Sequence, residues 1–293
     1  MHAYYSSRSE SMDCSLRQRN SRTVKKDDQQ DNEEKISKRY NDCDHLTLME
    51  QLMIMSLRKQ TTTLLSINIS NEKVSVILRG AMLIELGLEG YLELDGNSFT
   101  KKKLCDRHVV LIKKDKINDF LMNQCINHIS KHNGKYCIKQ WLLFLSGQSL
   151  NFMMIHLHIR LMRERLCKSL VDKGILEYGL QSNFFLKMHS FKFRNREEQK
   201  KILLLFQRGL LSEYQNDYTR YDPRILALIF LTYAAEVENL PTESLNEDDY
   251  VKAINNLYKI KDSNFNEIAR KVTNRFGDLY WGVFDAIKQL FNL

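Results

Sequence analysis

RLMRERLCKSLVDKG, residues 160–174, predicts an amphipathic helix that carries a cluster of positive charge. Apolar residues recur through this region at steps of four, three, four and four, the spacing of a buried helix face; they are Ile155, Ile159, Met162, Leu166 and Leu170. Arg160 and Arg163 would lie about 60° apart at ~100° per residue, so both can reach one ligand. Gly174 is predicted to cap the helix. The charged face is either solvated or the floor of an anion-binding site.

The composition favours a globular helical protein with an anionic partner. The chain has 293 residues, 43% of them hydrophobic, so it can bury one large core or two small ones. Only 2 prolines and 11 glycines are present, too few for a strand-rich sandwich with many turns. The 44 basic and 36 acidic side chains give a net charge of +8. This balance favours a lipid surface or nucleic acid without choosing between them.

No apolar run reaches the roughly 18 residues that cross a bilayer. The longest run, Ile225 to Ala235, predicts a buried core helix instead. The N-terminus has no apolar stretch for a signal peptide, and its second residue is His2 where myristoylation needs glycine. We therefore expect a cytosolic protein whose membrane contact is peripheral.

The chain divides by composition into a charged tail and one folded domain. Residues 1–43 have few apolar side chains and are predicted to be disordered, whereas residues 44–293 form a single domain. The tail carries arginines that include Arg17, Arg19 and Arg22. Such a tail either catches an acidic partner or only keeps the chain in solution. The acidic segment from Glu236 to Asp249 likewise either holds a basic peptide or is a solvated loop.

Local signals predict mainly helix with one or two β-hairpins. Thr47 and Glu50 form a capping-box pattern at the start of the first helix. Arg79 stands alone in the next apolar helix and needs a partner or an exit to solvent. Further helices are predicted over residues 117–129, 140–145, 197–206, 223–237, 248–258 and 276–290, and the first hairpin over residues 91–94 and 107–112.

A second hairpin is predicted from Ile175–Tyr178 and Asn183–Met188. Phe184, Phe185 and Phe191 lie among basic residues in and after it. Aromatic rings beside cations suit a membrane interface, but a half-buried strand with polar residues outward has the same alternation.

We expect neither an enzyme nor a cofactor. The sequence contains no phosphate-binding loop, dinucleotide fingerprint, zinc-protease motif or nucleophile elbow. Cys125, His128, His132 and Cys137 are zinc-ligand types at a spacing that is unusual for a zinc finger, so no metal is predicted. The neighbouring His156 and His158 are two apart and would point differently on a helix.

Six segments together resemble the Golgi phosphoprotein 3 family. The resemblance runs from about residue 46 to the C-terminus and is carried most specifically by LRGAMLIELGLEG and RERLCKSLVDKGIL. The segments are LTLMEQLMIMSLR (46–58), LRGAMLIELGLEG (78–90), QWLLFLSGQSLN (140–151), RERLCKSLVDKGIL (163–176), NFFL (183–186) and DPRILALIFL (222–231).

The resemblance implies a central helical bundle surrounded by amphipathic helices, with a β-hairpin. It also implies a peripheral adaptor on the cytosolic face of Golgi membranes and in the cytosol. Such an adaptor binds phosphatidylinositol 4-phosphate and the cytosolic tails of Golgi glycosyltransferases, and links them to coatomer for retrograde retention.

The family's functional residues carry over to several positions of this chain. The headgroup-binding arginines fall on Arg79, Arg160 and Arg163. The Phe-rich hairpin, with Phe184, Phe185 and Phe191, becomes a candidate membrane or homo-oligomer contact. The arginines at 17, 19 and 22 become the candidate coatomer-binding cluster.

The chain departs from the family at three places. Ser70 stands at the family's tryptophan position, the hairpin tip is altered, and Glu89 stands where arginine is common. A divergent protein scaffold with weak or lost lipid binding is therefore an alternative, and a basic nucleic-acid-binding module is another. On the adaptor hypothesis, Arg79→Ala, or Arg160→Ala with Arg163→Ala, should leave the fold intact and release the protein from membranes.

Overall fold

The structure is a computed structural model that describes residues 45–57, 61–63, 71–96, 102–183, 186–212, 217–237, 242, 244–272 and 276–293. The residues from Leu46 to Leu293 form one compact unit. The predicted tail, including Arg17, Arg19 and Arg22, lies outside the described residues, and so does Ser70.

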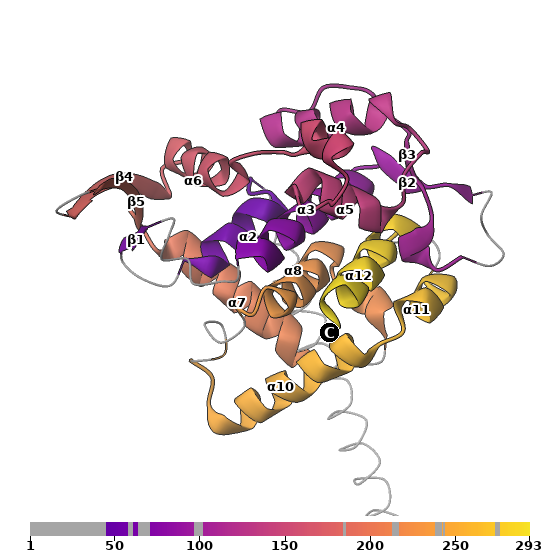
Figure 1. Cartoon of the computed structure of the whole chain (residues 1–293). Coiled ribbons are helices and arrows are strands. Elements are labelled where there is room, and N and C mark those ends of the chain that lie inside the picture. The colour runs from indigo at the N-terminus through magenta and orange to yellow at the C-terminus, as the bar shows by residue number, and fades with distance from the viewer. Residues whose placement is uncertain are drawn as a thin grey trace, which may run out of the picture. The chain divides into compact units, whose positions relative to one another are not determined.

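The unit is mainly helical, as predicted (Figure 1). Its α-helices are α2 (Leu48–Ser56), α3 (Asn71–Leu88), α4 (Phe120–Lys131), α5 (Ile138–Ser146), α6 (Met162–Asp172), α7 (Glu197–Leu211), α8 (Pro223–Ala234), α10 (Glu247–Asp262), α11 (Phe265–Lys271) and α12 (Asp278–Phe291). Short 3-10 helices are η2 (Leu104–Asp106), η3 (Phe152–Leu157) and η4 (Tyr218–Arg220). The strands are β1 (Thr61–Thr63), β2 (Leu92–Leu94), β3 (Val109–Leu111), β4 (Leu176–Asn183) and β5 (Leu186–Phe193).

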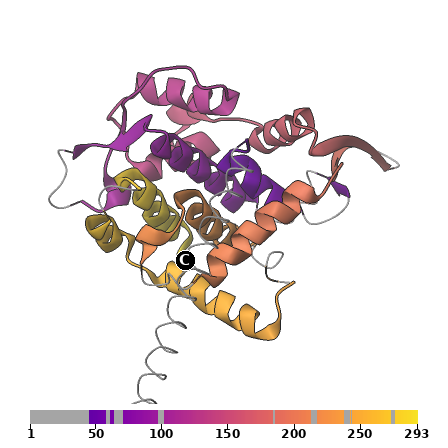
Figure 2. The ribbon, with the colours of Figure 1, turned by 180° about the vertical axis from the view of Figure 1, so that it is seen from behind.

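The core is built where α2, α3, α5, α8 and α12 pack together, and the amphipathic helices surround it (Figures 1 and 2). Every residue of α2 is buried, and α8 and α12 are buried over most of their length. Phe230 of α8 stacks on Phe284 of α12 with ring centroids 4.1 Å apart. Gly80 allows α3 to approach α12 closely, because a Cβ there would lie 2.8 Å from the side chain of Ile287. These helices are the predicted central bundle.

Predicted helix ends are confirmed where a local side chain or backbone signal sets them. The Thr47 hydroxyl accepts from the Glu50 amide, and the Glu50 carboxylate accepts from the Thr47 amide, which completes the capping box of α2. Pro223 occupies the first turn of α8. Gly147 ends α5 in the left-handed conformation, at φ +76°.

The helix of the opening segment begins later than predicted. α6 starts at Met162, and Arg160 lies in the turn before it, so the helical angle between Arg160 and Arg163 does not apply. Leu161 separates the two at φ +57°, a conformation that costs a non-glycine residue about 1 kcal/mol or more. The apolar seam is buried from Ile159 onward, whereas Ile155 lies in η3 and is exposed.

The two predicted hairpins are present, and one of them gains a third strand. β2 pairs antiparallel with β3, and β4 pairs antiparallel with β5, which runs five residues beyond the predicted end at Met188. β1 pairs with the outer side of β5, although its segment reads as a polar connector. The β4–β5 hairpin extends away from the helices beside α6 (Figures 1 and 2).

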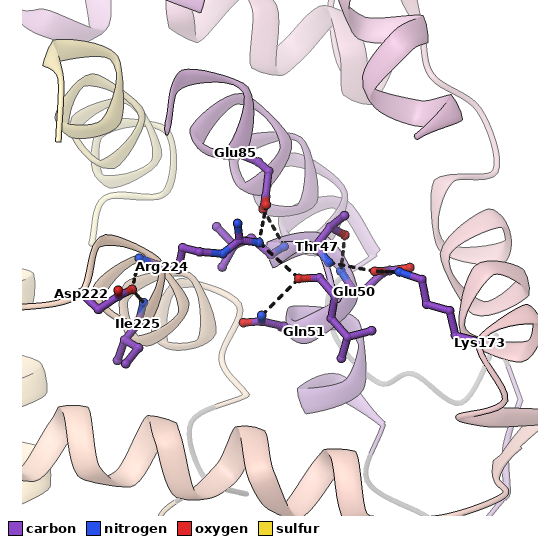
Figure 3. Close-up of polar contacts among 10 residues, drawn as sticks. Thr47, Glu50, Gln51, Glu85, Lys173, Asp222, Arg224 and Ile225 are labelled. Carbon is purple, nitrogen blue, oxygen red and sulfur yellow. Dashed lines mark hydrogen bonds and ion pairs between the residues drawn. The ribbon is translucent and has the colours of Figure 1, made fainter. Parts of the chain in front are cut away.

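A buried polar network holds α6 against the bundle (Figure 3). The Glu50 carboxylate accepts from Ser169 Oγ of α6 at 2.7 Å and pairs at 2.6 Å with Nζ of Lys173, the residue that caps the C-terminal end of α6. Nearby, Glu85 of α3 accepts from the Leu48 amide at 2.7 Å and pairs with Arg224 of α8. The start of α2 is thus bonded to α6 and to α3, and Glu85 connects α3 in turn to α8. This arrangement links α6 to α3 through α2.

Candidate anion-binding site

Arg79 lies within α3 and is only 3% exposed. Its Nε donates to the carbonyl oxygen of Leu145 at 3.1 Å, and its Nη1 donates to the carbonyl and hydroxyl oxygens of Ser75, both at 2.9 Å. Its Nη2 donates to the carbonyl oxygen of Ile159. All of these acceptors are neutral. They satisfy the N–H groups of the guanidinium without cancelling its charge.

The structure brings the three predicted headgroup residues together from three segments. Arg163 lies half-buried in the first turn of α6, and its charge lowers the pKa of Arg79. Arg160 is exposed in the preceding turn, directly after Ile159, whose carbonyl group binds Arg79. The three cations therefore come from α3, the turn and α6, and not from one helix face.

The electrostatics of this cluster disfavour positive charge. Burial, and then repulsion from Arg163, lower the pKa of Arg79 to about 10. Burial also lowers the pKa of Arg163. Both guanidinium groups remain charged at neutral pH, so they carry charge in a desolvated place. A bound anion would offset that cost.

His158 belongs to the same cluster, although its sequence position beside His156 indicates only a possible metal ligand. Burial lowers its pKa first, followed by the charges of Arg79 and Arg160. Its ring packs on the backbone of Gly147, where a Cβ would lie 2.8 Å from His158 Nδ1. The signal in the sequence was its spacing from Arg160, because residues two apart in an extended segment point to the same side.

The aromatic hairpin residues divide into two groups. Phe184 and Phe185 lie outside the described residues, so their assignment to a membrane or oligomer contact stays a prediction. Phe191 is 3% exposed and packs against Tyr178, with ring centroids 5.2 Å apart. Its ring contributes to the packing of the hairpin and is not on the surface of this chain.

Two other sequence features have structural roles. Glu236 pairs with Lys73, while Glu247, Asp248 and Asp249 lie in the first turn of α10, where negative charge favours the helix dipole. Within the described ranges, no three histidine, cysteine or acidic side chains are grouped so that they could hold a metal ion. Burial raises the pKa of the Cys125 thiol far above its ordinary value.

Residues 48–275 match the family described as Golgi phosphoprotein 3. Vacuolar protein sorting-associated protein 74 of Eremothecium gossypii is 34% identical over 142 residues, which are 48% of this chain and 41% of that protein. The chain thus aligns with less than half the length of that relative. Among the described residues, no helix is both long and apolar enough to cross a bilayer. Because the family match covers most of the sequence, the chain belongs to the Golgi phosphoprotein 3 family.

Proposed function

We propose that this chain is a peripheral Golgi adaptor, and not an enzyme, that binds phosphatidylinositol 4-phosphate through Arg79, Arg160 and Arg163. The observation that carries the proposal is the desolvated pair of Arg79 and Arg163, together with the exposed Arg160 in the turn before α6. A phosphate monoester carries up to two negative charges and several acceptor oxygens. Guanidinium groups match it well because they stay charged and can bond two oxygens at once.

Each cation has its own role in this proposal. Arg160 is exposed and can contact the phosphate directly. Arg163 is half-buried and provides a second donor from the start of α6, where the helix dipole also favours an anion. Arg79 contributes mainly its charge, because its hydrogen bonds to Leu145, Ser75 and Ile159 occupy most of its N–H groups.

The protein partners are proposed from family membership. The adaptor would bind the cytosolic tails of Golgi glycosyltransferases on the cytosolic face of the membrane and link them to coatomer for retrograde retention. The arginines at positions 17, 19 and 22 are the proposed coatomer-binding residues, and the β4–β5 hairpin is the proposed contact between copies of the chain.

The test is co-sedimentation of the purified protein with phosphatidylcholine vesicles that carry phosphatidylinositol 4-phosphate. Charge-matched vesicles with phosphatidylserine or phosphatidylinositol 3-phosphate are the lipid controls. We expect selective binding to the 4-phosphate and loss of that selectivity in the Arg160→Ala, Arg163→Ala double variant. Arg270→Ala, an exposed arginine on α11, is the matched control and should bind normally.

The alternative functions give different results in this assay. A protein scaffold with lost lipid binding would sediment with none of the vesicles. A generally basic protein would bind all anionic vesicles equally and would be displaced by DNA. Either result would contradict the proposed headgroup site.

A further inference from the structure

A run of exposed apolar side chains lies along the segment that contains Arg160 of the candidate anion-binding site. It consists of Leu150, Phe152, Met153, Ile155 and Leu161, which are all among the exposed large apolar side chains of the described residues. Leu150 is 96% exposed and Phe152 is 85% exposed. Solvent contact on this scale is unfavourable for aliphatic and aromatic side chains, and clusters of them mark binding sites. We name these five residues the apolar rim.

The apolar rim is held in place by a folded turn. The Asn151 side chain accepts from the Met153 amide at 3.1 Å, and the Met154 amide donates to the Asn151 carbonyl oxygen at 2.9 Å. At the end of η3, Leu157 and Ile159 are fully buried and anchor the segment in the core. The exposed side chains are therefore presented by an ordered turn and not by a frayed end.

Leu161 adds a second feature to the rim. It is 66% exposed and sits at φ +57°, between Arg160 and the start of α6. A leucine gains nothing in water from this strained conformation, and glycine or asparagine would fit it better. Leu161 is both strained and exposed, and it directly follows Arg160. These features point to a ligand that contacts Leu161 and the anion-binding site together.

The charge of residues 147–163 favours an anionic bilayer as the ligand of the apolar rim. Residues 147–163 contain no aspartate or glutamate, whereas they include Arg160, Arg163 and the partly buried His158. Apolar side chains beside cations match the boundary between acyl chains and anionic headgroups. This inference rests on the proposed function and extends it from the headgroup to the hydrocarbon.

We propose that the apolar rim inserts into the membrane while Arg160 and Arg163 bind the headgroup. In this arrangement, the rim determines how tightly the protein holds a vesicle, and the arginines determine which lipid it selects.

The first experiment places a fluorescent reporter on the rim. Phe152→Trp is mixed with phosphatidylcholine vesicles whose acyl chains are brominated and which carry phosphatidylinositol 4-phosphate. The native Trp141 and Trp281 are buried and should contribute little to quenching. Val251→Trp, at a 54% exposed apolar position on α10, is the matched control. Figures 1 and 2 both show α10 at the lower edge and α6 in the upper half.

We expect strong quenching of Phe152→Trp on these vesicles and none of Val251→Trp. Quenching on phosphatidylserine vesicles as well would support insertion while removing headgroup selectivity. Binding to the vesicles without quenching would overturn the insertion and leave the proposed function intact. Absence of binding to any anionic vesicle would overturn both. A blue shift of Phe152→Trp on self-association without lipid would make the rim an interface between copies instead.

The second experiment separates the rim from the headgroup site. The Leu150→Ser, Phe152→Ser, Met153→Ser variant should bind vesicles at least tenfold more weakly than the native chain. It should bind the soluble headgroup, inositol 1,4-bisphosphate, within about twofold of the native affinity in calorimetry, as expected for an intact pocket. Equal vesicle binding by the two proteins would overturn the proposal, and the headgroup measurement shows that the variant is folded.

Discussion

Arg79 and Arg160 carry the same charge in one cluster but have different structural roles. Arg160 is exposed, so its removal affects little besides the ligand. Arg79 joins α3 to the backbone at Leu145 and Ile159, which are the segments on either side of Gly147 and η3. The expectation that Arg79→Ala leaves the fold intact is therefore revised. A loss of membrane binding in the Arg79→Ala variant could not be assigned to the lost charge alone, because the variant also loses the hydrogen bonds that hold the fold.

Arg79→Ala is predicted to lower the free energy of unfolding by about 2–3 kcal/mol, because buried carbonyl groups lose their donor. Leu145 retains one donor, since the Ile159 amide also bonds its carbonyl oxygen at 3.1 Å. Arg160→Ala should change the stability by less than about 0.5 kcal/mol, as is usual for an exposed residue. Denaturant unfolding of both variants checks the prediction. Equal stability of the two would mean that Arg79 is not a structural residue.

His158 is predicted to make membrane binding depend on pH. Its pKa in the folded chain lies below the ordinary 6.5, owing to burial and then to Arg79 and Arg160. The ring is therefore neutral at pH 7.5 and gains a proton only in more acidic solution. A bound phosphate would favour the protonated form.

The measurement compares the native chain with His158→Gln on vesicles carrying phosphatidylinositol 4-phosphate. The ratio of their affinities should be near one at pH 7.5 and rise to roughly fivefold at pH 5.5, about 1 kcal/mol for one added charge. Using the ratio removes the effect of lipid protonation. The unfolded state binds the His158 proton more readily, so the native stability falls below pH 6.5 and circular dichroism must confirm folding. A constant ratio would exclude His158 from the site.

At the scale of elements, Glu50 connects the cap of α2 to the orientation of α6. Glu50→Ala is predicted to destabilise the fold by about 2–4 kcal/mol, because it removes a capping bond and the buried partner of Ser169 and Lys173. It should also weaken vesicle binding, since α6 carries Arg163. Thermal unfolding measures the first effect and co-sedimentation the second.

The matched control is Glu177→Ala, which removes an exposed ion pair with Lys192 on the hairpin. That change should cost less than about 1 kcal/mol, as surface ion pairs generally do. If Glu50→Ala proved no more harmful than Glu177→Ala, the network in Figure 3 would not be what holds α6.

Elements with a local signal could be predicted from the sequence, and those set by distant contacts could not. The capping box at Thr47 and the first-turn Pro223 bond or restrict neighbouring residues, so the chain itself encodes them. The break before α6 is different, because a leucine at positive φ contradicts local preference. It is imposed by the burial of Ile159 and by the bond from Arg79 to its carbonyl group. β1 was missed because its pairing with β5 lies far along the chain.

At the scale of the whole molecule, the candidate site combines what resemblance and structure each provide. The resemblance identified Arg79, Arg160 and Arg163. It could not show that Arg79 is enclosed by carbonyl groups, that Arg79 and Arg160 act on His158, or that the residues of the apolar rim are exposed. These features depend on the packing of η3 against α5 and on the bond from Arg79 of α3 to Ile159 just after η3, which no short motif records.

The net charge of +8 attracts the protein to every anionic surface, so only salt dependence separates attraction from recognition. The Debye length falls from about 10 Å at 0.1 M salt to about 3 Å at 1 M, and buried charges are screened less than exposed ones. Raising NaCl from about 0.1 M to 0.5 M should therefore reduce binding to phosphatidylserine vesicles at least tenfold. Binding to phosphatidylinositol 4-phosphate should fall by less than about threefold, because Arg79 and Arg163 are partly or wholly buried. Duplex DNA should compete with binding to phosphatidylserine vesicles and not with binding to phosphatidylinositol 4-phosphate. If salt weakened both equally, or if DNA displaced both, the positive charge would act as a diffuse field and the arginine cluster would not be a headgroup site.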